Sequence, residues 1–200
     1  MKKLLLANLL MFIAAITYAQ VNFGLKAGVN FASWTGADAG GSSTLTGFYA
    51  GGLVNIPISP MFSVQPELLY SGEGAKETGG DNKVSTGYIN IPLLLQYNSS
   101  PVSGFFAETG PQLGLLISAK SKNNGASVDV KSSFKSTAVS WALGLGYKFA
   151  EGLGFGARYT FGLTKLPSET GNGTNVKQNV ISVGVFKMFG GGGGGKMKRK

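Results

Sequence analysis

Residues 104–120, GFFAETGPQLGLLISAK, alternate between two kinds of side chain, and this alternation limits the possible folds more than any other feature of the chain. Successive side chains of an extended chain point to opposite faces. A strand of a soluble sheet rarely runs so long or turns glycine, glutamate and glutamine toward the protein interior. The pattern is typical of a transmembrane barrel, whose outer face contacts lipid and whose narrow lumen holds polar and small side chains. The predicted lipid-facing set is Phe105, Ala107, Thr109, Pro111, Leu113, Leu115, Ile117 and Ala119, and the predicted lumen-facing set is Phe106, Glu108, Gly110, Gln112, Gly114, Leu116, Ser118 and Lys120.

The same alternation recurs along the rest of the chain. In residues 153–163, for example, Phe155 and Tyr159 alternate with Gly154, Gly156 and Arg158. With the first segment, the recurrences give eight strands, so we expect an all-β fold: an eight-stranded antiparallel up-and-down transmembrane β-barrel. The predicted strands are 21–31, 46–58, 62–70, 84–97, 104–120, 137–149, 153–163 and 180–189.

The connections between these segments alternate in length. Short turns are predicted near 59–60, 98–103 and 150–152, and long polar loops at 32–45, 72–83, 121–136 and 164–179. Outer-membrane barrels have short periplasmic turns and long extracellular loops, so both ends of the barrel are expected in the periplasm. Seven aromatic residues lie near the short turns, as expected for an interfacial girdle: Phe62, Tyr97, Phe105, Tyr147, Phe149, Phe155 and Phe189.

Four prolines fall inside predicted strands, at Pro57, Pro66, Pro92 and Pro111. Proline lacks the N–H that a sheet ladder needs, and it normally lies at edges or bulges. A closed barrel has no edges. We therefore expect bulges or positions without ladder hydrogen bonds at these prolines.

The two ends of the chain differ from the barrel pattern. Residues 1–19 resemble a cleavable export signal: Lys2 and Lys3 precede an apolar run too short to span a bilayer, and small residues precede Gln20. A retained N-terminal anchor is the alternative. Residues 190–200, GGGGGGKMKRK, are expected to be a disordered basic tail. The tail is either a solvated charge run or a contact for anionic polymer or lipid. The barrel would then comprise residues 20–189.

The formal charge of +9 does not indicate nucleic-acid binding. Between residues 21 and 189 there are 12 Lys and Arg against 9 Asp and Glu, which leaves +3, because the other basic residues lie in the predicted signal and tail. No basic stripe is interleaved with aromatic residues. Residues 21–189 also contain no run of about 20 apolar residues that would form a spanning helix.

The sequence offers few groups for catalysis. It has no histidine, the commonest general base near neutral pH, and no cysteine for disulfides or thiolate metal sites. We expect no catalytic, cofactor-binding or metal-binding residues. Lys26, Glu67, Glu108 and Arg158 all have lumen-facing parity, and charges in a narrow lumen should pair. A structural polar network is the first interpretation, and a gated pore and a carboxylate-based active site are the alternatives.

Five motifs in order resemble the PorT family of outer-membrane β-barrel proteins. They are GLKAGVNFA (24–32), QPELLYSGEGAK (65–76), YINIPLLLQY (88–97), FFAETGPQLGLLISAK (105–120) and GARYTFGLTKL (156–166). The family is common in Bacteroidota, and its founding member belongs to a protein-secretion apparatus. Most other members have no assigned activity, so the resemblance implies the Gram-negative outer membrane more firmly than it implies a link to protein secretion.

The predicted function follows from the expected location and from the scarcity of residues that could catalyse a reaction. We expect a non-catalytic membrane component or partner-binding module that contacts outer-membrane lipid and binds protein partners through extracellular loops or periplasmic turns. A small gated channel for ions or small solutes is the alternative.

Overall fold

The computed structural model describes residues 21–40, 42–79, 82–123, 126–167 and 175–189. The predicted signal and tail lie outside these residues. No helix in the described part of the chain is long and apolar enough to cross a membrane. The elements are β1 (Asn22–Thr35), β2 (Ser42–Pro57), β3 (Phe62–Glu77), β4 (Lys83–Asn98), β5 (Gly104–Asn123), β6 (Ala126–Asp129), η1 (Lys131–Ser133), β7 (Thr137–Lys148), β8 (Leu153–Gly162) and β9 (Lys177–Phe189).

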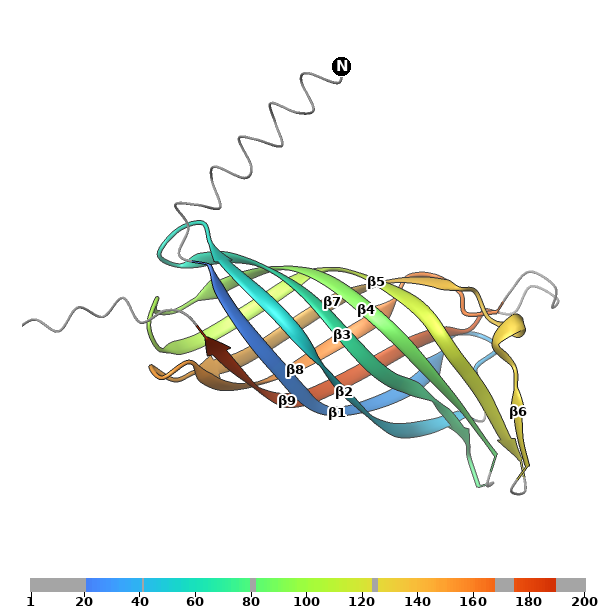
Figure 1. Ribbon diagram of the computed structural model, residues 1–200. Helices are drawn as coiled ribbons and strands as arrows, with labels where there is room; N and C mark the ends of the chain where they lie inside the picture. Colours follow the sequence, from blue (N-terminus) through green and yellow to red (C-terminus); the bar gives the residue numbers. More distant parts are fainter. Residues whose placement is uncertain (1–20, 41, 80–81, 124–125, 168–174, 190–200) are drawn as a thin grey trace, which may run out of the picture.

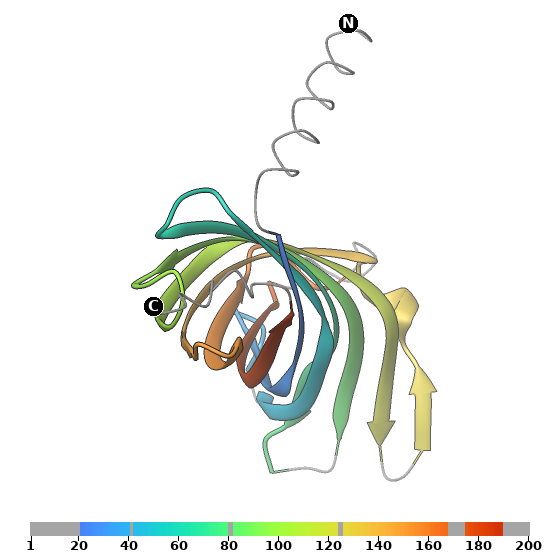
Figure 2. The same ribbon diagram turned by 60° about the vertical axis from the view of Figure 1, so that its left-hand side comes forward.

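Eight of the strands close into an antiparallel barrel, as predicted (Figure 1). The order around the ring is β1, β2, β3, β4, β5, β7, β8 and β9, and β9 pairs back with β1. Strand β6 stands outside the ring because it pairs with β5 beyond the barrel wall (Figure 2). Closure matters in a bilayer, since an unpaired strand edge would leave backbone polar groups in hydrocarbon.

The two faces of the barrel have the predicted polarity. Phe105 exposes 70% of its surface on the outside, whereas Glu108 exposes 5% on the inside. The outward side chains of the strands form an apolar surface, and most of the buried polar side chains lie in the lumen. This is the reverse of a soluble protein and suits a lipid surround.

The short turns lie at one end of the molecule, on the left of Figure 1. The start of β1 and the end of β9 lie at the same end. The aromatic residues predicted for this end are in contact there. The rings of Phe105 and Tyr147 are 5.0 Å apart, and those of Phe62 and Tyr97 are 5.2 Å apart. Such a group of aromatic rings is typical of a membrane interface, and the short turns are typical of the periplasmic end.

The predicted long loops were too long, because the strands continue into them. Strand β1 runs to Thr35, β3 runs to Glu77, and β5 runs to Asn123, where it turns back as β6. The loop residues are polar because these strand ends project beyond the lipid band, where both faces of a strand meet water. Polarity alone therefore did not distinguish a loop from a projecting strand.

The predicted faces of β5 are wrong beyond a shift in its register against β4. Between β4 and β5 the register shifts by one residue, since Gly87 lies opposite Ser118 while Tyr88 lies opposite Leu116. Beyond this bulge the faces of β5 exchange, so Ala119 is buried and Lys120 is exposed, the reverse of the prediction.

The prolines do not cause bulges. On either side of Pro66 the register between β2 and β3 is the same, with Leu53 opposite Glu67 and Ile56 opposite Val64. The recorded shifts lie elsewhere, between Thr44 and Tyr49 and at the β4–β5 bulge. Pro66, Pro92 and Pro111 each pair with one neighbouring strand and lack a partner on the other, which is the second of the two expected outcomes.

Candidate functional site

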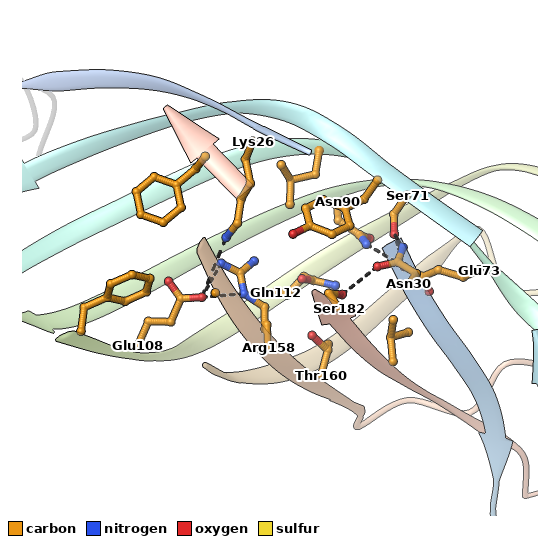
Figure 3. A pocket seen from close by; sticks show the side chains of 16 residues that line it. Lys26, Asn30, Ser71, Glu73, Asn90, Glu108, Gln112, Arg158, Thr160 and Ser182 are labelled. Carbon is orange, nitrogen blue, oxygen red and sulfur yellow. Dashed lines mark hydrogen bonds and ion pairs between the residues drawn. The ribbon is translucent and has the colours of Figure 1, made fainter. Parts of the chain in front are cut away.

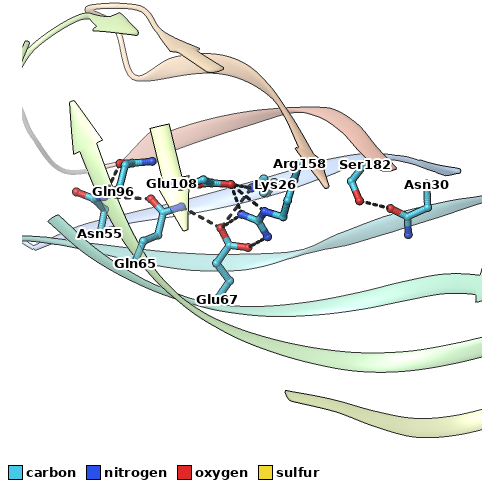
Figure 4. Close-up of polar contacts among 9 residues, drawn as sticks. All are labelled: Lys26, Asn30, Asn55, Gln65, Glu67, Gln96, Glu108, Arg158 and Ser182. Carbon is cyan, nitrogen blue, oxygen red and sulfur yellow. Dashed lines mark hydrogen bonds and ion pairs between the residues drawn. The ribbon is translucent and has the colours of Figure 1, made fainter. Parts of the chain in front are cut away.

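The four charged side chains singled out in the sequence meet in the middle of the lumen (Figure 4). The Arg158 guanidinium forms a two-pronged ion pair with Glu67: Nη1 lies 2.7 Å from Oε2, and Nη2 lies 2.8 Å from Oε1. Nη2 also lies 2.6 Å from Glu108 Oε1, and Nε lies 2.8 Å from the same oxygen. Lys26 Nζ lies 3.3 Å from Glu67 Oε1 and 4.0 Å from Glu108 Oε1.

These four residues come from alternate strands of the ring: Lys26 from β1, Glu67 from β3, Glu108 from β5 and Arg158 from β8. In an eight-stranded barrel the interior is just wide enough for side chains to fill it, and inward residues of alternate strands share a level. Two positive and two negative charges therefore occupy one cross-section. Because the formal charges cancel, we call this group the charge layer.

An amide network continues from the charge layer toward the periplasm. Gln65 Nε2 donates to Glu67 Oε1 at 2.9 Å, and Asn55 Nδ2 lies 3.0 Å from Gln65 Oε1 and 3.1 Å from Gln96 Oε1. Ser63 joins the network, with its Oγ 2.9 Å from Asn55 Nδ2. Sequence reasoning missed these residues because it considered only charged side chains, although their parity places them in the lumen.

A second carboxylate network lies on the extracellular side of the charge layer (Figure 3). Glu73 accepts hydrogen bonds from Ser71 Oγ and Asn90 Nδ2, both 2.8 Å long, and from Gln178 Nε2 at 2.9 Å. Asn30 joins this network through Ser71, at 2.8 Å. Among the described residues, Glu73 forms no ion pair. It was missed because residues 72–83 were predicted to be a loop.

Three small cavities, lined by both polar and apolar side chains, lie along the lumen. One of about 10 Å³ is on the periplasmic side of the charge layer, and two of about 30 Å³ each are on the extracellular side. A cavity needs roughly 10 to 15 Å³ to hold a water molecule, so the smallest has room for at most one and each of the other two has room for about two. Lys26 and Glu108 line both the small cavity and its neighbour, which places the charge layer between them.

Apolar clusters also lie in the lumen, on both sides of the charge layer. On the periplasmic side Phe106 and Phe186 pack edge to face at 5.7 Å, together with Leu53. On the extracellular side the segment after β6 folds over the mouth, where Val130 and Phe134 pack against a buried group. That group consists of Tyr88, Leu116 and Ala119.

The arrangement offers little chemistry. Within the described part of the chain, no group of three or more Asp or Glu side chains is placed to hold a metal ion. The carboxylates of the charge layer are occupied by Arg158 and Lys26, although Glu108 Oε2 is buried without a hydrogen-bond partner among the described residues. The geometry can brace the barrel and block passage.

The closed barrel, its apolar outer surface and its polar interior define an integral outer-membrane β-barrel protein. The family model for the outer membrane protein beta-barrel domain matches residues 17–167, so the chain belongs to this family. The protein is therefore located in the outer membrane of a Gram-negative bacterium. No curated protein is significantly similar to the chain.

Solved structures of outer-membrane barrels are similar in fold. The Neisserial surface protein A (NspA) is 18% identical, with a TM-score of 0.51 over 84% of this chain and 97% of that chain. The attachment invasion locus protein Ail of Yersinia pestis, in complex with the heparin analogue sucrose octasulfate, is 15% identical, with a TM-score of 0.48 over 85% and 99%. OprG of Pseudomonas aeruginosa is 14% identical, with a TM-score of 0.47 over 86% and 98%. At these identities the likeness concerns the fold alone.

Proposed function

We propose that the protein is a non-catalytic, non-conducting membrane component that binds a protein partner at its extracellular end. The observation that carries this proposal is the two-pronged ion pair between Arg158 and Glu67, which crosses the lumen at its centre. A solute would have to separate this pair in a desolvated interior. Breaking a buried pair costs about 3 to 5 kcal/mol when one partner is lost, so the closed state should persist.

Apolar contacts in the lumen on both sides of the charge layer also support a non-conducting barrel. The Phe106–Phe186 contact lies on the periplasmic side, and Val130 and Phe134 cover the extracellular mouth. A transport function would require all three levels to open. Partner binding on the surfaces outside the lipid band requires no such opening.

The strand pair β5–β6 is the surface best suited to a protein partner. Every residue of β6 is exposed, and β6 pairs with β5 along one edge but with no described strand along the other. An unpaired edge can accept an extended segment through backbone hydrogen bonds. Val128, 61% exposed on β6, offers an apolar contact beside that edge.

We also propose that the protein is a member of the PorT family and is linked to protein secretion. The support for this proposal is the ordered set of motifs in the sequence, and the barrel strands in which those motifs lie. A secretion apparatus needs outer-membrane components that hold other proteins in place, and an exposed strand edge suits that task.

A small gated channel is the second candidate, and the cavities in the lumen favour it. They lie on both sides of the charge layer, so the layer would act as the central gate. Planar-bilayer recordings separate the two candidates. We expect negligible steady current from the wild-type protein, whereas large and stable single-channel currents would favour the channel.

Partner binding is tested by replacing the ASVD sequence of β6 with GSGS, which keeps the chain length but weakens the strand. The matched control replaces SPVS at residues 100–103, in a periplasmic turn, with GSGS. Chemical cross-linking on intact cells should recover partners with the control but not with the β6 variant. If the β6 variant retains every partner and the control loses them, the binding surface is periplasmic.

A further inference from the structure

Three lysines lie side by side on neighbouring strands at the extracellular end of the barrel. The register places Lys76 of β3 directly opposite Lys83 of β4, and Lys83 directly opposite Lys122 of β5. All three side chains are exposed. We call Lys76, Lys83 and Lys122 the lysine row. Lys120, also exposed, lies opposite Ser85, two residues closer to the membrane along β5.

The lysine row points sideways from the barrel wall. Lys76 has the same strand parity as the lipid-facing Leu68 and Tyr70, and Lys83 has the same parity as the lipid-facing Ile91. The row therefore does not face across the mouth of the lumen. It faces whatever surrounds the barrel at that height.

The height can be calculated from strand geometry. Lys76 is 14 residues beyond Phe62, an aromatic residue at the periplasmic interface. With a rise of about 3.3 Å per residue and a tilt of about 40°, the distance along the membrane normal is roughly 35 Å. The apolar band of such a barrel is about 25 Å tall. The row thus lies about 10 Å above the hydrocarbon, at the level of the outer-leaflet headgroups.

The lysine row lowers the stability of the barrel when no anion is bound to it. Like charges directly opposite each other on neighbouring strands destabilise a sheet. Among the described residues, no ion pair involves any of these lysines, although Glu77 and Asp129 lie nearby at the strand ends. Glu77 accepts a hydrogen bond from Asn82, and Asp129 accepts one from the backbone of Lys131. An external anion would remove the repulsion.

We propose that the lysine row binds the phosphate groups of outer-leaflet lipid, so that β3, β4 and β5 form a lipid-headgroup site on the barrel wall. The sideways direction and the headgroup height both select a membrane lipid over a ligand arriving from solution. Ammonium groups attract phosphate as point charges, and long lysine side chains extend toward the headgroup level. The apolar residues below the row would contact the acyl chains of the same lipid.

The proposal is tested with bisphosphorylated lipid A and its dephosphorylated form, each presented in detergent micelles to the purified barrel. The variant carries Lys76→Gln, Lys83→Gln and Lys122→Gln. The control carries Lys131→Gln, Lys135→Gln and Lys165→Gln, which removes the same charge from other extracellular segments. Each lysine near an anionic surface contributes about a fivefold factor. We expect the row variant to lose about a hundredfold in affinity for the phosphorylated lipid, and the control to lose less than fivefold.

A second measurement uses Lys83→Gln alone and detects the repulsion within the row. In vesicles of zwitterionic lipid this variant should raise the urea midpoint of unfolding, because the central charge of the row is gone. With bisphosphorylated lipid A in the vesicles, the same variant should lower the midpoint. If the role of Lys83 were purely structural, the substitution would shift the urea midpoint in the same direction in both lipids.

Three results would overturn the proposal. They are equal wild-type affinity for the phosphorylated and dephosphorylated lipids, equal losses in the row variant and the control, and tighter binding of a soluble anionic polysaccharide than of the lipid. The gel migration of unheated samples shows that each variant is folded, because closed barrels resist detergent.

Discussion

Arg158 and Glu67 lie on strands half the ring apart and still touch, with Nη1 2.7 Å from Oε2. Three strands lie between β8 and β3 in either direction around the barrel. The ion pair therefore crosses the lumen as a brace. Lys26 and Glu108 are also on opposite strands, and their contact of 4.0 Å is longer. The two ion pairs cross at one level, and each connects opposite walls of the barrel.

Arg158→Met tests the stronger brace. The substitution leaves two buried carboxylates with Lys26 as their remaining cation, and removing one partner of a buried ion pair costs about 3 to 5 kcal/mol. We expect a loss of that size in the free energy of unfolding, measured by urea titration from lipid vesicles. Lys131→Met, an exposed position on η1, is the control and should change stability by less than about 0.5 kcal/mol.

Adding Glu67→Gln to Arg158→Met should recover part of the loss, because one of the stranded carboxylates is then neutral. An Arg158→Met variant as stable as the wild type would show that the charge layer does not hold the barrel together.

The fold could be predicted because a barrel strand repeats its polarity every second residue. Glu67, Glu108 and Arg158 keep this parity, so their lumen position follows from the sequence. Glu73 has the same parity as Glu67, and the alternation through Ser71 and Glu73 could have revealed it. The polar and glycine-rich composition of residues 72–83 concealed it, because a strand above the lipid band has no apolar face.

The register could not be predicted in the same way. Ile117 is the extra residue of the β4–β5 bulge, and no feature of β5 alone indicates an extra residue. A one-residue shift turns every later side chain to the other face. The lysine row depends on this shift, because Lys122 would otherwise face the lumen.

The faces of β5 give the second prediction. Leu113 is 41% exposed near the middle of the strand, and its neighbour Gln112 is 8% exposed in the lumen. Leu113→Arg should destabilise the barrel by about 2 to 4 kcal/mol, because its charge would enter the bilayer. Gln112→Arg should act through crowding in the lumen and show little dependence on bilayer thickness. Unfolding measured in thin and thick bilayers distinguishes the two. A harmless Leu113→Arg would contradict the face assignment.

A close approach inside the lumen gives the third prediction. Gly28 of β1 and Gly184 of β9 lie opposite each other under Tyr49. A Cβ on Gly184 would lie 2.3 Å from the backbone oxygen of Ala27 and 2.4 Å from the Tyr49 hydroxyl. Gly184→Ala should therefore destabilise the barrel by about 1 to 3 kcal/mol in urea unfolding.

Gly40 provides the control for this substitution, since a Cβ there would meet nothing within 4 Å. Gly40→Ala should be neutral or stabilise by up to about 1 kcal/mol, because alanine restricts the unfolded chain. Equal effects at Gly184 and Gly40 would mean that the β1–β9 contact is looser than the structure shows.

The last prediction concerns the closures of the lumen, which lie in series. The charge layer is at the centre, Phe106 and Phe186 lie on the periplasmic side, and Phe134 covers the extracellular mouth. A path closed at three levels conducts only when all three are open. Arg158→Ala alone should therefore give at most brief openings in planar bilayers, and Phe106→Ala with Phe134→Ala should give none, because the charge layer remains. The triple variant should show sustained current.

If Arg158→Ala alone conducted steadily, the aromatic closures would not seal the lumen, and the charge layer would be the gate of a channel. If the triple variant remained silent while its gel migration showed a folded barrel, the remaining side chains would fill the lumen without these closures, and the function would lie entirely on the outer surfaces.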